Sequence, residues 1–168
     1  MAVTFLGETA VKTYGELPLP GSVAPDAVLV KTDLLECRIS DFKGQNLVLN
    51  IFPSIDTPTC ATSVRKFNQM AASMADTQVL CISRDLPFAM KRFCGAEGID
   101  NVITASDFRD GSFGKTYGVE MTDGPLRHLH ARAVVVIDKN GKVVHSSLVE
   151  RIGDEPDYDS AIAAISHG

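Results

Sequence analysis

The sequence predicts a layered α/β fold, built as one domain over residues 1–168 with a β-hairpin extension at its N-terminus. Short apolar runs typical of strands alternate with amphipathic segments typical of helices. Two late strands are joined by Asp138-Lys139-Asn140-Gly141, which is a strong hairpin signal. A length of 168 residues suits one domain, and no repeat, low-complexity tract or charge block divides the chain.

The N-terminal segment predicts the hairpin extension. Residues 3–6 and 10–14 are its two strands, and the chain turns near Gly7-Glu8. Residues 17–21, Leu-Pro-Leu-Pro-Gly, are expected to form an extended linker into the main body.

The main body is expected to open with strands. Residues 28–31 and 37–39 are weak strands around a polar turn. Residues 47–52 are nearly all apolar and are stopped by Pro53. This pattern predicts a central strand that is buried on both faces.

A helix follows the central strand. Thr57 can cap it, and Pro58 then occupies the first helical position, where a missing N–H costs nothing. We expect the helix to end at Asp76-Thr77. Its apolar stripe, at spacings of three and four, comprises Val64, Phe67, Ala71 and Met74.

The second half of the chain continues the alternation. Strands are expected at 79–82, 102–104, 133–137 and 143–148. Helices are expected at 87–94, stopping before Gly95, at 108–117, ending at Gly118, and at 157–166. This element order is the thioredoxin-like arrangement with extra N-terminal strands.

Composition excludes several functional classes. The net charge of −5 argues against a large basic surface for nucleic acid. No apolar run reaches the roughly 18 residues that span a bilayer, so no membrane partner is expected. The N-terminus lacks the pattern of a secretory signal, so we expect a cytoplasmic protein. A periplasmic protein whose signal was removed before residue 1 is the alternative.

Four cysteines occupy positions 37, 60, 81 and 94. They are too few for a disulfide-stapled scaffold, which a domain of this size does not need. Their spacing contains no Cys-x-x-Cys pair, so a structural zinc site has no support. In a reducing compartment, a disulfide among them would be transient and catalytic.

Cys60 falls at about the third position of the expected helix. Backbone N–H groups and the positive end of the helix dipole there favour a thiolate. The hydroxyl of Thr57 can face the same point, and Pro53 can screen it from one side. Arg132, before the strand 133–137, can supply five N–H donors in a fixed fork. The plainer alternatives are an inert, half-buried Cys60 and a surface charge at Arg132.

The stretch from Pro53 to Cys60 contains Pro-x-x-x-Thr-x-x-Cys, the active-site signature of the peroxiredoxins. The chain resembles in particular the bacterial thiol peroxidase subfamily, of the atypical two-cysteine type. The likeness runs from about residue 15 to the C-terminus, and segments 63–68, 92–98 and 131–138 also agree with the subfamily.

The resemblance implies an antioxidant enzyme that reduces hydrogen peroxide and organic (alkyl) hydroperoxides. Cys60 matches the peroxidatic cysteine, and Thr57, Pro53 and Arg132 match the residues that activate it. Cys94 matches the resolving cysteine, so the product would be an intramolecular Cys60–Cys94 disulfide. The resemblance further implies recycling by thioredoxin, a homodimer, and no metal or organic cofactor.

Two cysteines on different helices need not lie within bonding distance. We therefore expect local unwinding of one or both helices to bring Cys60 and Cys94 together. Cys81, inside a strand, is expected to be buried and inert, and Cys37 to be a partly exposed strand thiol. His128 and His130 are expected to be solvated loop residues rather than metal ligands.

Two other functions share parts of this pattern. A dithiol–disulfide oxidoreductase or isomerase acting on proteins would need a close Cys-x-x-Cys, and Cys60-Ala-Thr-Ser63 lacks the second cysteine. A redox sensor or chaperone-like module would share the first oxidation step and differ only in turnover.

Overall fold

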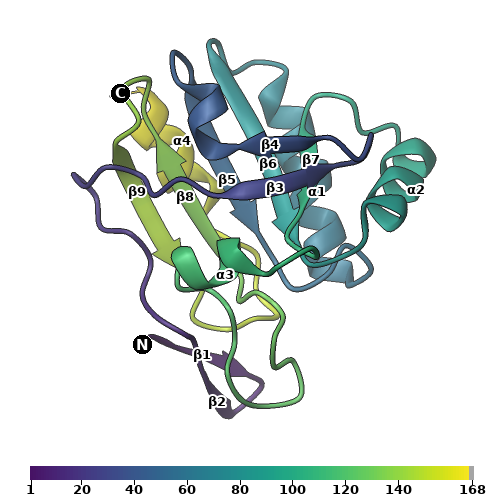
Figure 1. Cartoon of the computed structure of the whole chain (residues 1–168), viewed down its shortest axis with the longest axis vertical. Coiled ribbons are helices and arrows are strands. Elements are labelled where there is room, and N and C mark those ends of the chain that lie inside the picture. Colours follow the sequence, from purple (N-terminus) through teal and green to yellow (C-terminus); the bar gives the residue numbers. More distant parts are fainter. Residues whose placement is uncertain (167–168) are drawn as a thin grey trace.

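A computed structural model of the protein describes residues 1–166 (Figure 1). The strands are β1 (Val3–Leu6), β2 (Thr9–Lys12), β3 (Val28–Lys31), β4 (Glu36–Arg38), β5 (Asn46–Ile51), β6 (Thr77–Ser83), β7 (Ile103–Ser106), β8 (Ala133–Ile137) and β9 (Val143–Leu148). The helices are the 3₁₀ helix η1 (Ile39–Phe42) and the α-helices α1 (Pro58–Ala71), α2 (Pro87–Glu97), α3 (Ser112–Thr116) and α4 (Tyr158–Ser166).

Seven strands form one mixed sheet in the order β4-β3-β7-β6-β5-β8-β9, and β1 and β2 form a separate hairpin. The predicted α/β fold and N-terminal hairpin are therefore confirmed. The last two residues of the expected domain range, 167 and 168, lie outside the described residues. None of the helices described between residues 1 and 166 has the length and apolar character to cross a membrane.

β5 is an interior strand of the sheet, between β6 and β8, and is buried on both faces, as its apolar run predicts. All six of its residues are buried. It pairs in parallel with β6 and antiparallel with β8, so Leu49 lies between Leu80 and Val135. The chain leaves this strand at Ile51, directly before the segment that leads to Cys60.

Each face of the sheet supports its own core. On one face, Leu49 and Val135 pack with Phe113 and Tyr117. On the other, Val48 and Val134 pack beneath α1, α2 and α4, in a cluster that also contains Cys60, Cys81 and Cys94. In Figure 1, α2 lies at one side of the sheet and α4 behind β8 and β9.

The hairpin packs on the segment that follows β9. Thr4, which is fully buried, donates its hydroxyl to the carbonyl oxygens of Val149 (2.9 Å) and Glu150 (3.0 Å). Phe5 donates its N–H to Glu150 and accepts from the N–H of Ile152, both at 2.9 Å. Val11 and Ile152 share a small apolar cluster. The hairpin thus fixes the course of residues 149–152.

The structure corrects three helix boundaries. α2 runs to Glu97 rather than stopping before Gly95, because Gly98 takes the left-handed conformation (φ 66°) that ends it. α3 begins at Ser112 rather than at residue 108, because the carboxylate of Asp107 accepts the N–H groups of Phe113 (3.1 Å) and Gly114 (2.9 Å). α1 ends at Ala71, five residues earlier than expected. The closing helix is confirmed, and Asp157 accepts the N–H of Ser160 at its start (3.1 Å).

Candidate active site

Cys60 is the third residue of α1 and is fully buried. Thr57 is the N-cap residue and Pro58 takes the first helical position, as the sequence predicts. The sulfur therefore lies where the free N–H groups of the first helical turn and the positive end of the helix dipole favour negative charge.

Arg132 lies against this sulfur. Its side chain is only 2% exposed, so the surface-charge alternative is wrong. One terminal nitrogen, Nη2, donates to Cys60 Sγ at 3.3 Å, and Nε donates to the carbonyl oxygen of Ile152 at 2.8 Å. The other terminal nitrogen, Nη1, is buried without a hydrogen-bond partner. Two of the three guanidinium nitrogens of Arg132 are therefore held by hydrogen bonds, and the N–H groups of the third remain available.

Pro53 and Thr57 belong to the loop between β5 and α1. Pro53 is buried and Thr57 is half-buried. The Thr57 hydroxyl donates to the carbonyl oxygen of Ser54 at 3.1 Å and does not cap α1. The expected side-chain cap is therefore wrong, although the N-cap position is right. The hydroxyl closes a turn within the loop instead.

Residues 153–158 lie against the start of α1. The Thr59 hydroxyl donates to the carbonyl oxygen of Gly153 (3.0 Å), and Lys66 pairs with Glu155 (2.9 Å). Hydrogen bonds from Lys66 and Tyr158, together with the nearby charge of Arg132, hold the pKa of Glu155 below its usual range. This segment and the 53–57 loop both lie at the start of α1, where Cys60 is fully buried.

Cys94 has a different setting. It lies in α2, is half-buried, and its sulfur is 3.8 Å from the hydroxyl of Thr104. Burial raises the pKa of its thiol. It lines a surface hollow of about 330 Å³ together with Lys31, Thr32, Asp33, Ile99, Asp100, Val102, Ile103 and Thr104. Both Cys60 and Cys94 are free thiols.

The other two cysteines are buried in the core. Burial raises the pKa of Cys81 to about 12, in agreement with an inert packing residue. Burial also raises the pKa of Cys37 to about 11, and only 4% of its surface is exposed. The expected partial exposure of Cys37 is therefore wrong, because β4 pairs with β3 and the Cys37 side chain packs in the core cluster with Leu29 and Ile39.

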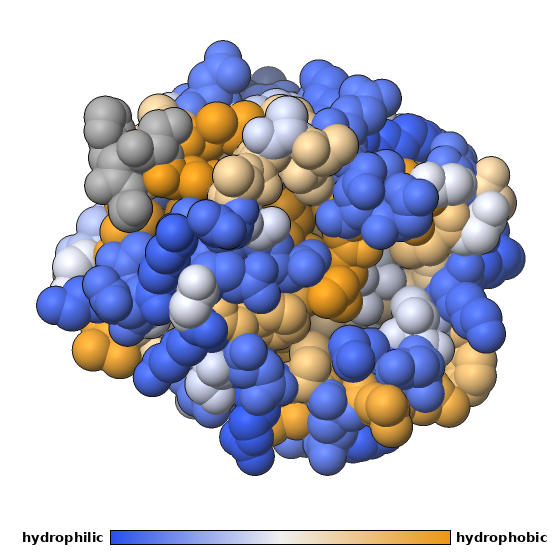
Figure 2. All heavy atoms as spheres, turned by 90° about the horizontal axis from the view of Figure 1, so that it is seen from above, coloured by the Kyte–Doolittle hydropathy of each residue, from blue (hydrophilic) through white to orange (hydrophobic). Residues whose placement is uncertain are grey.

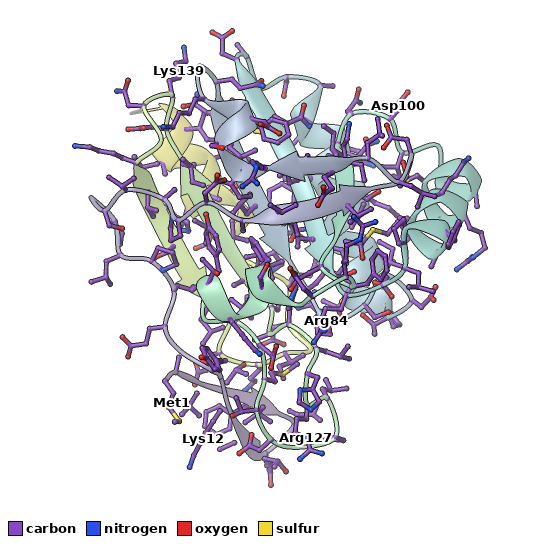
Figure 3. All side chains as sticks on the ribbon, viewed as in Figure 1. Met1, Lys12, Arg84, Asp100, Arg127 and Lys139 are labelled. Carbon is purple, nitrogen blue, oxygen red and sulfur yellow. The ribbon has the colours of Figure 1, made fainter. Side chains whose placement is uncertain are left out.

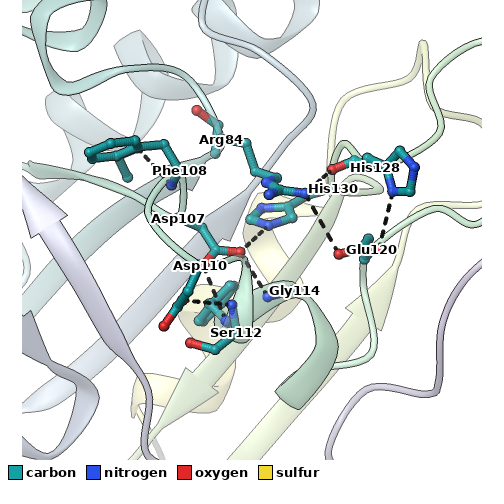
Figure 4. Close-up of polar contacts among 12 residues, drawn as sticks. Arg84, Asp107, Phe108, Asp110, Ser112, Gly114, Glu120, His128 and His130 are labelled. Atoms are coloured by element: carbon teal, nitrogen blue, oxygen red, sulfur yellow. Dashed lines mark hydrogen bonds and ion pairs between the residues drawn. The ribbon is translucent and has the colours of Figure 1, made fainter.

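The two histidines before Arg132 separate in the structure (Figure 4). His128 is exposed and its Nδ1 lies 3.5 Å from a carboxylate oxygen of Glu120. His130 is fully buried, with Nε2 2.8 Å from Asp107, so the solvated-loop prediction is wrong for this residue. The chain turns at His128 (φ 77°) and pairs back on Glu120, which carries His130 inward.

Within residues 1–166, no group of three or more His, Cys, Asp or Glu side chains could hold a metal ion.

A cavity of about 260 Å³ lies at the end of the sheet where β5 begins and β8 ends, opposite to the end that carries Cys60. Figure 2 views the molecule from the end away from the hairpin, where apolar side chains (orange) lie among hydrophilic ones (blue). No cysteine among the described residues lines this cavity.

Sequence reasoning missed three polar residues that support the site. Asn50, buried in β5, donates to Ser63 Oγ (3.1 Å), which in turn donates to the carbonyl oxygen of Cys60 (2.8 Å). Asp85 accepts from Ser54 Oγ (2.8 Å) and from the N–H of Ile55 (2.7 Å). A lone asparagine in an apolar run was the available signal for Asn50, whereas nothing local marks Asp85.

Comparisons with known proteins agree on one family. Residues 19–162 match the model of the Redoxin family. The chain is 53% identical to the thiol peroxidase of Corynebacterium glutamicum, over 99% of this chain and 100% of that one. It is also 53% identical to the thiol peroxidase of Mycobacterium tuberculosis, over 98% of this chain and 99% of that one.

Solved structures show the same fold. A peroxiredoxin-like protein from Aquifex aeolicus superposes with a TM-score of 0.94 at 41% identity, covering 99% of this chain and 97% of that chain. A thiol peroxidase from Chromobacterium violaceum superposes with a TM-score of 0.90 at 21% identity, covering 99% and 96%.

Proposed function

Because the chain belongs to the Redoxin family, as a peroxiredoxin-type thiol peroxidase, we propose that Cys60 is the sulfur that attacks the peroxide. The observation that carries this proposal is the hydrogen bond of 3.3 Å from the buried Arg132 guanidinium to Cys60 Sγ, at the start of α1. A fixed positive charge and the helix dipole both stabilise the thiolate, which is the nucleophilic form.

In the first step, the Cys60 thiolate attacks one oxygen of a hydroperoxide. The O–O bond breaks, the sulfur becomes a sulfenic acid, and the second oxygen leaves with a proton as water or an alcohol. Negative charge develops on that leaving oxygen. The unpartnered Nη1 of Arg132 is an N–H donor that can bind it, which makes the guanidinium a shared partner of the sulfur and the oxygen.

In the second step, the Cys94 thiolate attacks the Cys60 sulfenic sulfur, and hydroxide leaves and takes up a proton to give water. The product is an intramolecular Cys60–Cys94 disulfide. A disulfide requires Cα atoms about 4.4–6.8 Å apart. Since Cys60 is enclosed and Cys94 contacts Thr104 on β7, unwinding at α1, α2 or both precedes this step.

We further propose that thioredoxin reduces the disulfide by thiol–disulfide exchange and that the substrates are hydrogen peroxide and organic hydroperoxides. The family resemblance supports both proposals. A homodimer is proposed on the same ground, and the exposure of Leu86 (52%) and Phe88 (66%) near the site offers apolar surface for a second copy. We also propose that the chain forms a single domain and acts in the cytoplasm.

A coupled assay tests this function. The protein is combined with thioredoxin, thioredoxin reductase, NADPH and cumene hydroperoxide, and NADPH consumption is followed. We expect sustained turnover that is lost in Cys60→Ser, while Cys37→Ser turns over normally. One equivalent of peroxide consumed and then a stop would indicate a sensor. Normal turnover by Cys60→Ser would refute the assignment of the nucleophile.

A further inference from the structure

Asp85 occupies the connection between β6 and α2, at the end of the sheet that carries the active site. In Figure 3 its neighbour Arg84 lies at the end of the sheet away from Lys139. Both carboxylate oxygens of Asp85 are used. One accepts from Ser54 Oγ at 2.8 Å, and the other accepts from the N–H of Ile55 at 2.7 Å and from the hydroxyl of Ser83. The carboxylate therefore binds two successive residues of the 53–57 loop.

The position of Asp85 is itself fixed. Its carbonyl oxygen accepts the Ser106 hydroxyl, and that hydroxyl also accepts the N–H of Phe108 at 3.2 Å. The neighbouring backbone continues the sheet, since Asp107 donates its N–H to Ser83 at 2.9 Å. Ser83 and Ser106 are both buried. Asp85 is thus tied by hydrogen bonds to the ends of both β6 and β7.

Ser54 connects Asp85 to α1 through hydrogen bonds. Its carbonyl oxygen accepts both the N–H (3.2 Å) and the hydroxyl (3.1 Å) of Thr57, the N-cap residue. The carbonyl oxygen of Thr57 then accepts the N–H of Ala61 at 3.0 Å, in the first turn of the helix. A continuous chain of hydrogen bonds therefore runs from Asp85 to the helical turn that contains Cys60.

We propose that Asp85 is a positioning residue for the peroxidase reaction. It holds the 53–57 loop so that the first turn of α1 presents Cys60 to the Arg132 guanidinium. It acts through Ser54 and does not touch the reacting atoms. This inference rests on the proposed role of Cys60 as the nucleophile.

The same geometry predicts that loss of Asp85 affects peroxide attack and disulfide formation differently. Asp85 lies two residues before Pro87, at the first turn of α2, whereas Cys94 lies towards the other end of that helix. Loss of the carboxylate therefore loosens the loop that organises peroxide attack and leaves the part of α2 around Cys94 intact. Attack slows, whereas formation of the disulfide from the sulfenic acid keeps its rate or gains speed.

The test uses Asp85→Ala and Ser54→Ala in a Cys94→Ser background, which stops the reaction at the sulfenic acid. The chain has no tryptophan, so the rate is measured by quenched flow with mass spectrometry of the oxidised Cys60 peptide. Since small misplacements of a reacting group cost up to about 100-fold, we expect Asp85→Ala to slow attack by about 10- to 100-fold. Ser54→Ala slows it less, and Ser54→Thr, which keeps the hydroxyl, restores the rate.

Asp56→Asn is the matched control. It changes an exposed carboxylate in the same loop, whose partner is the exposed Arg92, and attack keeps its parent rate. The disulfide-forming step is then measured for Asp85→Ala with Cys94 present, where a slowed second step would indicate general destabilisation and overturn the proposal. If circular dichroism shows that Asp85→Ala does not fold, the attack rates of Ser54→Ala and Ser54→Thr test the proposal instead. Equal rates in these two variants would then overturn it.

The experiments distinguish failure of the proposed role of Asp85 from failure of the proposed function of Cys60. Parent rates in both Asp85→Ala and Ser54→Ala, with an inert Cys60→Ser, would overturn the role of Asp85 and leave the function of Cys60 standing. Peroxide consumption by Cys60→Ser at the parent rate would overturn the function itself.

Discussion

The start of α1 and the second half of α2 each carry one of the two proposed reacting thiols, yet they are built differently. Cys60 is fully enclosed and lies 3.3 Å from the buried Arg132. Cys94 is half-buried, lines an open hollow, and its sulfur has a hydroxyl at 3.8 Å as its polar neighbour. One thiol is held by a buried charge, and the other directly precedes the exposed last turn of its helix, residues 95–98.

The contacts that retain α2 sharpen this contrast. The side chain of Glu97 accepts two hydrogen bonds from Arg65 (2.8 and 3.0 Å), and Arg92 pairs with Asp56 at 2.9 Å. All four side chains are at least about one-third exposed, so these ion pairs contribute little. The polar contacts of the α1 site are buried, whereas the ion pairs of α2 lie at the surface. This difference suits one thiol to fast attack and the other to movement.

The largest expected effect comes from Cys94→Ser. The variant forms the sulfenic acid with one equivalent of peroxide but cannot form the disulfide, so thioredoxin-linked turnover is lost. NADPH consumption and peroxide consumption measured together check this outcome. Cys81→Ala, which removes the buried thiol near Cys94, retains cycling. Undiminished cycling by Cys94→Ser would mean that another thiol resolves the sulfenic acid.

Arg132→Lys tests the ordered site. Lysine keeps the positive charge but lacks the fork that binds Ile152, the sulfur and an oxygen together. Loss of one donor to a developing oxyanion costs about 100- to 1,000-fold, so we expect a decrease of that size in the rate of sulfenic acid formation. Quenched flow measures this rate. Arg127→Ala, a change at an exposed arginine in the preceding loop, serves as the control. A rate within about twofold of the parent would contradict the proposed role of the guanidinium.

The pH dependence of disulfide formation tests whether α2 opens around Cys94 before the disulfide forms. Burial raises the pKa of Cys94 in the folded helix, and unwinding returns it toward the ordinary thiol value of about 8.5. The stabilisation of the closed helix that comes from this raised pKa is fully present below about pH 8.5 and is lost as pH rises above it.

The reactive thiolate fraction of the opened form also rises with pH. We therefore expect disulfide formation to accelerate by about tenfold per pH unit below the ordinary thiol pKa. Single-turnover mixing with peroxide, followed by acid quench and mass spectrometry for the loss of two hydrogens, gives the rate. A flat profile between pH 6 and 8 would contradict this account.

The smallest expected effect comes from Glu97→Gln. The change removes the charge that Arg65 binds and weakens the attachment of the α2 end to α1. Disulfide formation should accelerate by less than about fivefold, as expected for an exposed pair. Glu36→Gln on β4, which breaks an exposed pair with Arg109, leaves that rate unchanged. A slower reaction in Glu97→Gln would show that an intact α2 end assists the step.

Local pattern predicted much of the fold and the central part of the site. β5 follows from an apolar run, α1 from Pro58 and its stripe, and the β8–β9 hairpin from its turn residues. The places of Cys60 and Arg132 follow from these elements, because Cys60 lies in the first turn of α1 and Arg132 directly precedes β8. Such features depend on neighbours within a few residues, which sequence patterns describe well.

The remainder depends on contacts between distant segments. Asp107 sets the start of α3 through its carboxylate, and the pairing of His130 with Glu120 decides the burial of that histidine. Asp85 reaches a loop 30 residues earlier in the chain, and Ile152 binds Arg132 across 20 residues. No local periodicity encodes these contacts, so sequence reasoning could not find them.

The hairpin at the N-terminus has a consequence for biosynthesis. Thr4 bonds to Val149 and Glu150 across 145 and 146 positions, and these residues lead to the carbonyl group of Ile152 that fixes Arg132. β1 therefore leaves the ribosome about 145 residues before the segment that it binds. Until β1 meets residues 149–152, the carbonyl group that anchors the guanidinium is not fixed, so Arg132 is not held in place against the Cys60 sulfur.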